Sequence, residues 1–187
     1  EQIGGLMRAI NAFSGTPVVR CAMLLQAYTA TRPGETRWAE WDEFDGDLWR
    51  IPAVRMKRRL LHVVPLSTQA QAVLDDLRHF SGAGTLLFPS ARDRRRPISD
   101  AAVNAGLRRM GFAQDEFTGH SFRSMFSTIA NENGWAPDAI ERQLAHVEGN
   151  AVRAAYNHAE YLPQRREMLQ WWADWLEQMA EACPLRK

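Results

Sequence analysis

Apolar residues recur at helical spacing along most of the chain. Ile3, Leu6, Met7 and Ile10 mark the first such stretch, and a Trp-rich and Leu-rich stretch forms the last. A period of three to four residues is typical of amphipathic helices. The pattern predicts helices over residues 3–13, 18–30, 67–80, 99–110, 120–131, 136–146, 151–156 and 164–180.

Two short segments in the first third of the chain show a different pattern. Residues 48–52 and 60–66 are rich in apolar and β-branched side chains, and a turn sequence, Asp45-Gly46-Asp47, precedes the first of them. This composition is typical of strands. The basic run 55–59 lies between the two strands, so we predict a hairpin whose connection carries positive charge.

Length and composition indicate one domain. The chain has 187 residues, of which 45% are hydrophobic, and this is enough for one substantial core over residues 1–187. It has no apolar run of about 18 residues, so we expect a soluble, intracellular protein without a membrane span. Cys21 and Cys183 lack metal-ligand spacing and are expected to be ordinary thiols. Because the chain opens directly on a helix and not on Met, we expect a fragment of a longer protein.

The charge distribution tells more than the net charge. The net charge is only +1 and indicates no partner. Basic residues, however, gather in residues 55–59 and 92–96. Clusters of this size occur on ordinary solvated surfaces about as often as at anion-binding surfaces.

The first candidates for chemistry lie near residue 120. His120 and Arg123 are three residues apart and would share one face of a helix. The planar fork of an arginine is well suited to the non-bridging oxygens of a phosphate. His146 and Tyr156 follow at short range. A single histidine is usually structural and a lone tyrosine usually packs, so none of these residues is decisive alone.

Further candidates lie upstream. Arg32 sits at a break between two helices, with Glu35 three residues later, where it could point into a cleft or form an ordinary surface ion pair. Lys57 lies on the predicted hairpin, and the only other lysine is Lys187. A lysine releases its proton more easily than an arginine, as general-acid catalysis requires. A single lysine in an arginine-rich chain can also arise by chance.

Together these residues fit one reaction, the attack of a tyrosine on a phosphodiester. Such a transfer needs a nucleophile, positive charge at the equatorial oxygens and a proton for the leaving group. Tyr156 would supply the nucleophile and Lys57 the proton, while two arginines and two histidines would surround the phosphate. Six residues from five separated segments would therefore have to converge.

These residues also resemble the pattern of a known family. The pattern consists of Arg32-x-x-Glu35, Lys57, His120-x-x-Arg123, His146 and Tyr156. It is similar to the catalytic domain of the tyrosine recombinases, the phage integrase family. The runs 141–146 and 152–161 resemble the branch of integrases carried by prophages and genomic islands. The resemblance covers nearly the whole chain.

The resemblance implies a fold and a mechanism. The fold would be mainly α with a small antiparallel β-sheet, the tyrosine recombinase catalytic-domain fold. Tyr156 would attack a phosphate of duplex DNA to form a 3′-phosphotyrosyl bond, without a metal or any other cofactor. His120 would take the phenolic proton, Lys57 would protonate the leaving 5′ oxygen, and Glu35 would support the site.

The sequence departs from the family pattern in three places. The family often has glycine where this chain has Ala30 and Ala145, which brings the backbone geometry into question. The interval from His146 to Tyr156 is ten residues rather than the commoner nine. Tyr161 is therefore an alternative nucleophile, although the residues around Tyr156 match the family better. The remaining tyrosine, Tyr28, lies in an apolar helix and is expected to be structural.

The resemblance also implies partners. The chain would bind the attachment sites of double-stranded DNA as a homotetramer and be a monomer alone, in the bacterial cytoplasm at the nucleoid. Accessory DNA-bending or excision factors could assist, and the arm-binding and core-binding domains would lie outside residues 1–187. The Trp-rich tail after Pro163 could pack on its own domain or on a neighbour. The expected DNA contacts are Arg55, Arg58, Arg59, Arg94, Arg95 and Arg96.

Two other functions remain open. A type IB topoisomerase shares the tyrosine chemistry but relaxes supercoils without exchanging strands between partners. A DNA-binding module that has lost catalysis is the second alternative. The presence of all six candidate catalytic residues argues against the module, and the run 152–161 argues against the topoisomerase.

Overall fold

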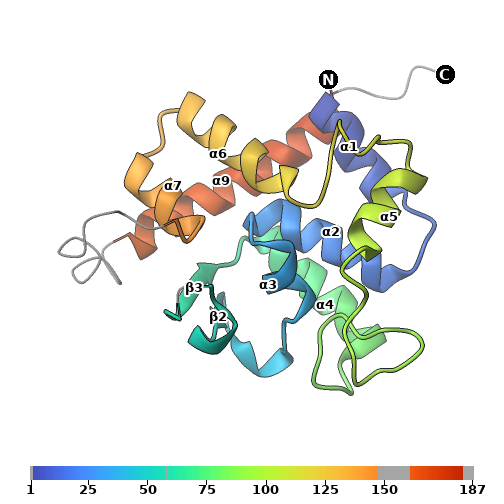
Figure 1. Ribbon diagram of the computed structural model, residues 1–187. Coiled ribbons are helices and arrows are strands. Elements are labelled where there is room, and N and C mark those ends of the chain that lie inside the picture. The colour runs from blue at the N-terminus through green and yellow to red at the C-terminus, as the bar shows by residue number, and fades with distance from the viewer. Residues whose placement is uncertain (1, 58, 147–160, 183–187) are drawn as a thin grey trace.

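A buried helix, α2 (Pro17–Thr29), lies at the centre of the molecule (Figure 1). The computed structural model describes residues 2–57, 59–146 and 161–182. Thr16 caps α2, because its hydroxyl accepts a hydrogen bond from the Val19 N–H, and Pro17 occupies the first turn. From Cys21 to Thr29 every residue of α2 is buried, which agrees with its nearly continuous apolar sequence.

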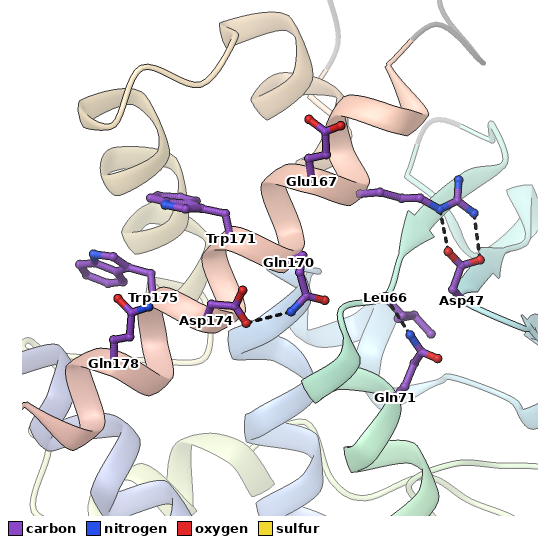
Figure 2. A pocket seen from close by; sticks show the side chains of 10 residues that line it. Asp47, Leu66, Gln71, Glu167, Gln170, Trp171, Asp174, Trp175 and Gln178 are labelled. Atoms are coloured by element: carbon purple, nitrogen blue, oxygen red, sulfur yellow. Dashed lines mark hydrogen bonds and ion pairs between the residues drawn. The ribbon is translucent and has the colours of Figure 1, made fainter.

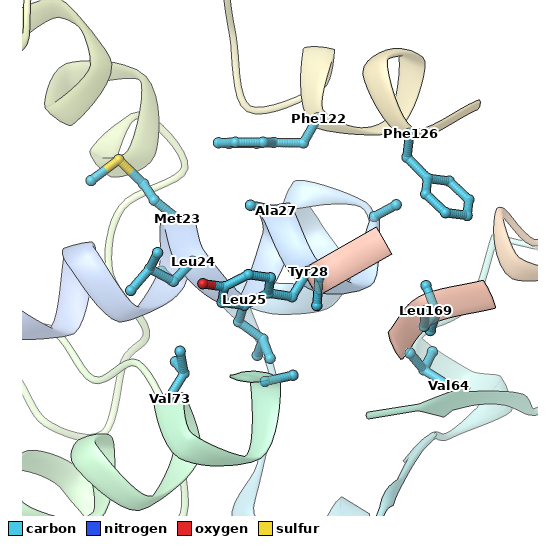
Figure 3. Packing of buried hydrophobic residues seen from close by; sticks show 14 of the residues in the cluster. Met23, Leu24, Leu25, Ala27, Tyr28, Val64, Val73, Phe122, Phe126 and Leu169 are labelled. Carbon is cyan, nitrogen blue, oxygen red and sulfur yellow. The ribbon is translucent and has the colours of Figure 1, made fainter. Parts of the chain in front are cut away.

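The core forms where other helices cover α2 (Figure 3). Val73 of α4 (Thr68–Ser81) packs on one side, and Phe122 and Phe126 of α6 (Ser121–Glu132) pack on the other. Leu169 of α9 (Leu162–Glu181) closes the cluster next to Val64 of the sheet. Because α2 contacts all these elements, its C-terminal end is held rigidly.

The first and last described helices lie side by side. α1 (Gln2–Asn11) runs along the C-terminal half of α9, and Arg8 Nη1 donates to the Ala180 carbonyl at 2.9 Å. Gly4 lies against the backbone of Met179 and leaves no room for a side chain there. The helix α9 therefore packs on its own domain.

The sheet has three antiparallel strands in the order β1-β2-β3. β1 (Phe44–Asp45) and β2 (Leu48–Ile51) are joined by a tight turn at Gly46, and β3 (His62–Pro65) pairs with β2. The predicted hairpin is present. β1 was not predicted, because two residues are too few to show an alternating pattern. Two 3₁₀ turns, Trp41–Glu43 and Ala53–Arg55, flank β1 and β2.

Two helix boundaries differ from the prediction. α5 (Ala102–Arg109) begins later than residue 99, since the Ser99 carbonyl forms a turn by accepting from the Ala102 N–H. α7 (Pro137–Gln143) ends before His146, because the backbone at Ala145 is left-handed, with φ 47°. The short helix predicted over residues 151–156 lies outside the described residues. In the described part of the chain, no helix combines the length and apolarity needed to cross a bilayer.

Candidate active site

Arg32 is fixed at the turn between α2 and α3 (Pro33–Arg37). α2 ends in a left-handed residue, Ala30, with φ 52°, whose N–H donates to the Gln26 carbonyl. Arg32 then becomes the N-cap of α3. Its backbone N–H donates to Glu35 Oε2 at 2.9 Å and its guanidinium to Glu35 Oε1 at 2.7 Å. Glu35, which is buried, thus holds both the backbone and the side chain of Arg32.

Arg123 joins the turn at Ala30 to the end of α7. It is buried on α6, where Nη1 donates to the Ala30 carbonyl and Nη2 to the Leu144 carbonyl, both at 2.7 Å. Nη2 also lies 3.2 Å from His146 Nε2. Burial, followed by the charge of Arg32, lowers the pKa of Arg123 to about 10, so the guanidinium stays charged at neutral pH.

His146 follows a compact helix end. The His146 N–H donates to the Glu141 carbonyl and the Ala145 N–H to the Arg142 carbonyl, which is the Schellman arrangement with Ala145 in the left-handed position. The imidazole lies between two partners, with Nδ1 3.0 Å from Glu141 Oε2 and Nε2 facing Arg123. The Ala145 carbonyl in turn accepts from Arg32 Nη2 at 3.2 Å.

A cleft of about 270 Å³ opens in front of these residues. Arg32, Ala145 and His146 line one part of it, and Lys57 lines another. Lys57 is exposed and lies on the connection between β2 and β3. Arg32, Lys57 and His146 thus line one cleft, and Arg123 lies behind it in contact with His146. These four residues come from four separate segments of the chain.

His120 lies at the N-terminus of α6, one turn before Arg123. Its side chain is exposed, but the surrounding protein still removes part of its hydration. This desolvation, followed by the charges of Arg123, Arg32 and His146, lowers the pKa of the imidazole. Each of these causes disfavours the protonated ring. His120 is therefore a neutral imidazole at neutral pH, able to accept a proton.

The chain contains three tyrosines, and the structure describes two of them. Tyr28 is buried in α2, where burial and the nearby Glu177 raise the pKa of its phenol to about 12. Tyr161 precedes α9, and its hydroxyl donates to Asp138 Oδ2 at 3.1 Å. Tyr156, the predicted nucleophile, lies outside the described residues.

The arginines predicted to contact DNA occupy different surroundings. Arg55 points inward and binds the carboxylate of Glu43 and the carbonyl of Glu35. Arg59, in contrast, is exposed. A loop closed by a bridge between Pro89 and Pro97 carries three further exposed arginines, Arg94, Arg95 and Arg96. Arg58 lies outside the described residues.

The sequence pattern that defines the phage integrase family matches residues 1–162. The chain belongs to the phage integrase family. Prophage integrase IntA of Escherichia coli K12 is 44% identical over 176 residues, which are 93% of this chain and 42% of that protein. The integrase of Enterobacteria phage P4 is 46% identical over 185 residues, which are 90% of this chain and 42% of that protein. The chain thus spans about two fifths of the length of these curated relatives.

Several solved structures share the fold. XerA recombinase superposes with a TM-score of 0.65 at 20% identity, over 91% of this chain and 63% of that one. The lambda integrase catalytic core gives a TM-score of 0.61 at 20% identity, over 79% of this chain and 91% of that one. A lambda integrase dimer bound to a COC′ core site gives 0.60 at 19% identity, over 87% and 45% of the two chains. The predicted fold class is confirmed.

Four residues in or behind this cleft were not singled out from the sequence. His62 and Arg142 line the cleft, and Gln143 and Arg165 are buried behind it. Burial, followed by the charges of Arg165 and Arg142, lowers the pKa of His62 well below its usual value. A signal for Arg165 does exist, since it shares the helical stripe of Met168, Leu169 and Trp172 and an arginine on an apolar stripe is expected to be buried with partners.

A second hollow, of about 650 Å³, lies elsewhere on the domain (Figure 2). It lies along α9 and is lined by Trp171, Trp175 and several polar side chains. Its one arginine, Arg166, is already paired with Asp47, with Nε–Oδ2 and Nη2–Oδ1 distances of 2.6 and 2.8 Å. Because it lacks a cluster of cations, this hollow is less suited to a phosphate than the cleft at Arg32.

Proposed function

We propose that this chain is the catalytic domain of a site-specific DNA recombinase, an integrase that cleaves and rejoins duplex DNA to integrate or excise a prophage or genomic island. The observation that carries the proposal is that Arg32, Arg123 and His146 lie together beside a cleft that Lys57 also lines. Arg123 contacts His146 directly and binds the Ala30 carbonyl, and Arg32 binds the Ala145 carbonyl. Such a site is built for a phosphate.

The residues divide the work of a phosphoryl transfer. The phenolic oxygen of Tyr156 attacks the scissile phosphorus, the P–O5′ bond breaks, and a 3′-phosphotyrosyl bond forms. His120, whose pKa is lowered by partial burial and then by its cationic neighbours, takes the phenolic proton, and Lys57 gives a proton to the departing 5′ oxygen. Arg32, Arg123 and His146 stabilise the charge on the equatorial oxygens.

Two consequences follow for the reaction. The phosphoester energy is kept in the tyrosyl bond, so a 5′-hydroxyl can reverse the step without ATP or a metal. Tyr156 is the best nucleophile among the three tyrosines, because Tyr28 is buried and the Tyr161 hydroxyl binds Asp138. Glu35 acts on the substrate only through Arg32.

The proposed substrate is double-stranded DNA carrying attachment sites. Lambda integrase has been solved as a dimer on a core site and as a tetramer on a Holliday junction, which supports a multimer on DNA for this chain as well. Arg59 and the loop of Arg94, Arg95 and Arg96 would contact phosphates, while Arg55 would support the hairpin from inside. Arm-binding and core-binding domains of the whole integrase, accessory factors and a cytoplasmic, nucleoid-associated location belong to the same proposal.

The two alternatives predict different behaviour. A type IB topoisomerase would relax supercoiled plasmid without a specific site, and a silent DNA-binding module would form no covalent product. The names of the curated relatives favour an integrase over both.

A nicked duplex tests the proposal. The duplex should carry the junction between the mobile element and its host chromosome, with a nick just 3′ of the scissile phosphate, so that the short fragment bearing the new 5′-hydroxyl diffuses away and cannot reverse the step. We expect a covalent protein–DNA adduct that resists denaturation, disappears in Tyr156→Phe and persists in the matched control Tyr161→Phe. Loss of the adduct in Tyr161→Phe alone would move the nucleophile to Tyr161, and no adduct with the unaltered chain would contradict the proposed chemistry.

A further inference from the structure

A fully buried glutamine lies directly behind the cleft. Gln143 ends α7 and has no exposed surface. Its Nε2 donates to the Thr29 carbonyl at 2.7 Å, and its Oε1 accepts from Arg165 Nε at 3.1 Å and Nη2 at 2.7 Å. Both ends of the amide are therefore used, one toward α2 and the other toward α9.

Arg165, the partner of Gln143, extends the hydrogen-bond network to the sheet. It is buried in the first turn of α9, and its Nη2 also donates to the Val63 carbonyl of β3 at 2.7 Å. Within the described ranges no carboxylate lies within 4.0 Å of its guanidinium, so its hydrogen bonds go to neutral oxygens. Burial, followed by the charge of Arg142, lowers its pKa to about 9.

Among the described residues, Arg165 is a buried arginine whose acceptors are all neutral, and burying a guanidinium in this way costs free energy. Desolvation of a guanidinium opposes folding, and apolar side chains of similar volume would fill the same space at less cost. What the apolar alternative cannot supply is direction, because a planar fork with several fixed donors holds its acceptors at defined angles. The pair of Gln143 and Arg165 therefore fixes the orientation of its backbone partners more than it adds to the free energy of unfolding.

The three backbone segments bound by this pair are those that lead into the cleft. Thr29 directly precedes Ala30, whose carbonyl holds Arg123, and Arg32 follows two residues later. Gln143 itself is three residues before His146. Val63 lies on the strand that returns from the Lys57 connection.

We propose that Gln143 and Arg165 are positioning residues, which set the Arg32 turn, the His146 turn and the Lys57 hairpin at the distances that the reaction needs. This inference rests on the proposed function. Neither residue touches the phosphate. Their effect passes through Thr29 and Val63, and a misplacement of about 1 Å at such a site can lower a rate by about a hundredfold.

Gln143→Glu separates positioning from packing. The variant keeps the volume and the acceptor for Arg165, but it loses the N–H donor and places a carboxylate oxygen against the Thr29 carbonyl. We expect a protein that melts close to the unaltered chain and binds the nicked duplex within about twofold, but forms the adduct about 10- to 100-fold more slowly at saturating DNA. Gln178→Glu, an exposed exchange of the same kind on α9, should leave all three quantities unchanged.

A second variant and a second measurement keep the test decisive. Arg165→Lys retains the charge but cannot bind Gln143 Oε1 through two nitrogens, and it should slow adduct formation in the same way even if Gln143→Glu fails to fold. If both folded variants form the adduct at the unaltered rate at saturating DNA, the positioning role is wrong. A slow rate that saturating DNA restores would also overturn it, because it would indicate binding.

The crystal structure of Gln143→Glu gives a readout that does not depend on DNA. We expect the Ala30 turn and the Arg32 guanidinium to move away from Ala145 and His146. An unchanged arrangement would overturn the inference even if the unaltered chain forms no adduct. An unaltered chain that does form the Tyr156 adduct, with variants that are equally fast, would reject the positioning role and leave the proposed function standing.

Discussion

Ala30 and Ala145 combine an unfavourable backbone conformation with a direct role in the site. Both are left-handed, with φ 52° and 47°, and each carbonyl accepts from an arginine, Arg123 for Ala30 and Arg32 for Ala145. The αL conformation costs an L-residue roughly 1–2 kcal/mol relative to its preferred state. Glycine, which has no Cβ, adopts this conformation without that cost.

Replacing either alanine with glycine should stabilise the protein. For Ala30→Gly and Ala145→Gly we expect the free energy of unfolding to rise by about 0.5–1 kcal/mol each, because relief of the αL cost exceeds the extra freedom of glycine in the unfolded chain. For a domain of this size the melting temperature should rise by roughly 1–4 °C, measured by calorimetry.

The exposed helical Ala105 of α5 provides the matched control. Ala105→Gly places the same exchange in a right-handed helix and should lower the free energy of unfolding by about 1 kcal/mol. Equal destabilisation by all three exchanges would contradict the left-handed assignment at Ala30 and Ala145.

Among the helices, α9 packs on α2 through a buried tryptophan, Trp172. Trp172 is fully buried, stacks on Trp175 with ring centroids 5.4 Å apart, and meets Phe126 edge-on at 5.5 Å. Its Nε1–H donates to the Ala27 carbonyl at 2.7 Å. In this structure residues 162–181 therefore pack on their own domain.

Shortening this tryptophan should loosen α9. Trp172→Phe removes a buried hydrogen bond and leaves a void, and we expect a loss of about 2–3 kcal/mol in the free energy of unfolding. Trp38→Phe serves as the control, because Trp38 is 43% exposed and a phenyl ring can still lie beneath Arg37. Urea titration should separate the two, and similar losses would indicate that α9 is not held by Trp172.

The sequence predicted elements better than their ends. Helical and strand periods identified α1, α2, α4, α6, α9 and the hairpin, because buried faces repeat at a fixed spacing. The end of α7 was placed beyond Gln143, since alanine at position 145 gives no sign of a left-handed turn and glycine would have. Chemistry-bearing residues such as Arg32 and His146 could be named from identity and order. Gln143 could not, because the backbone carbonyl that it binds, that of Thr29, is distant in the sequence. For Arg165 the apolar stripe indicates burial, but its backbone partner, the Val63 carbonyl, is equally distant and could not be named.

The whole molecule carries little charge for a protein proposed to act on DNA. The net charge is +1, and in the described part of the chain exposed basic residues cluster at the Lys57 connection and in the loop of Arg94, Arg95 and Arg96. Binding through a few phosphate contacts releases few counterions and gives modest affinity. High affinity for DNA therefore requires contacts in addition to those of the Lys57 connection and the arginine loop.

These 187 residues alone should bind duplex DNA weakly and with a clear salt dependence. We expect a Kd in the micromolar range or weaker, rising roughly 40- to 150-fold between 50 and 200 mM salt if three or four phosphates are contacted. Replacing Arg94, Arg95 and Arg96 with alanine should flatten the salt dependence, whereas Arg109→Ala on α5 should not. Fluorescence anisotropy would measure this, and nanomolar binding that ignores salt would contradict it.

Arg165 follows all the residues proposed for the chemistry along the chain, and this order has a consequence for protein synthesis. A ribosome that has reached residue 160 has already made every side chain assigned to the chemistry, from Arg32 to Tyr156. The arginine that joins their three segments, and the tryptophan that docks its helix, are still to come. A polypeptide that stops before Arg165 would therefore contain the residues proposed for DNA cleavage but lack the contacts proposed to align them.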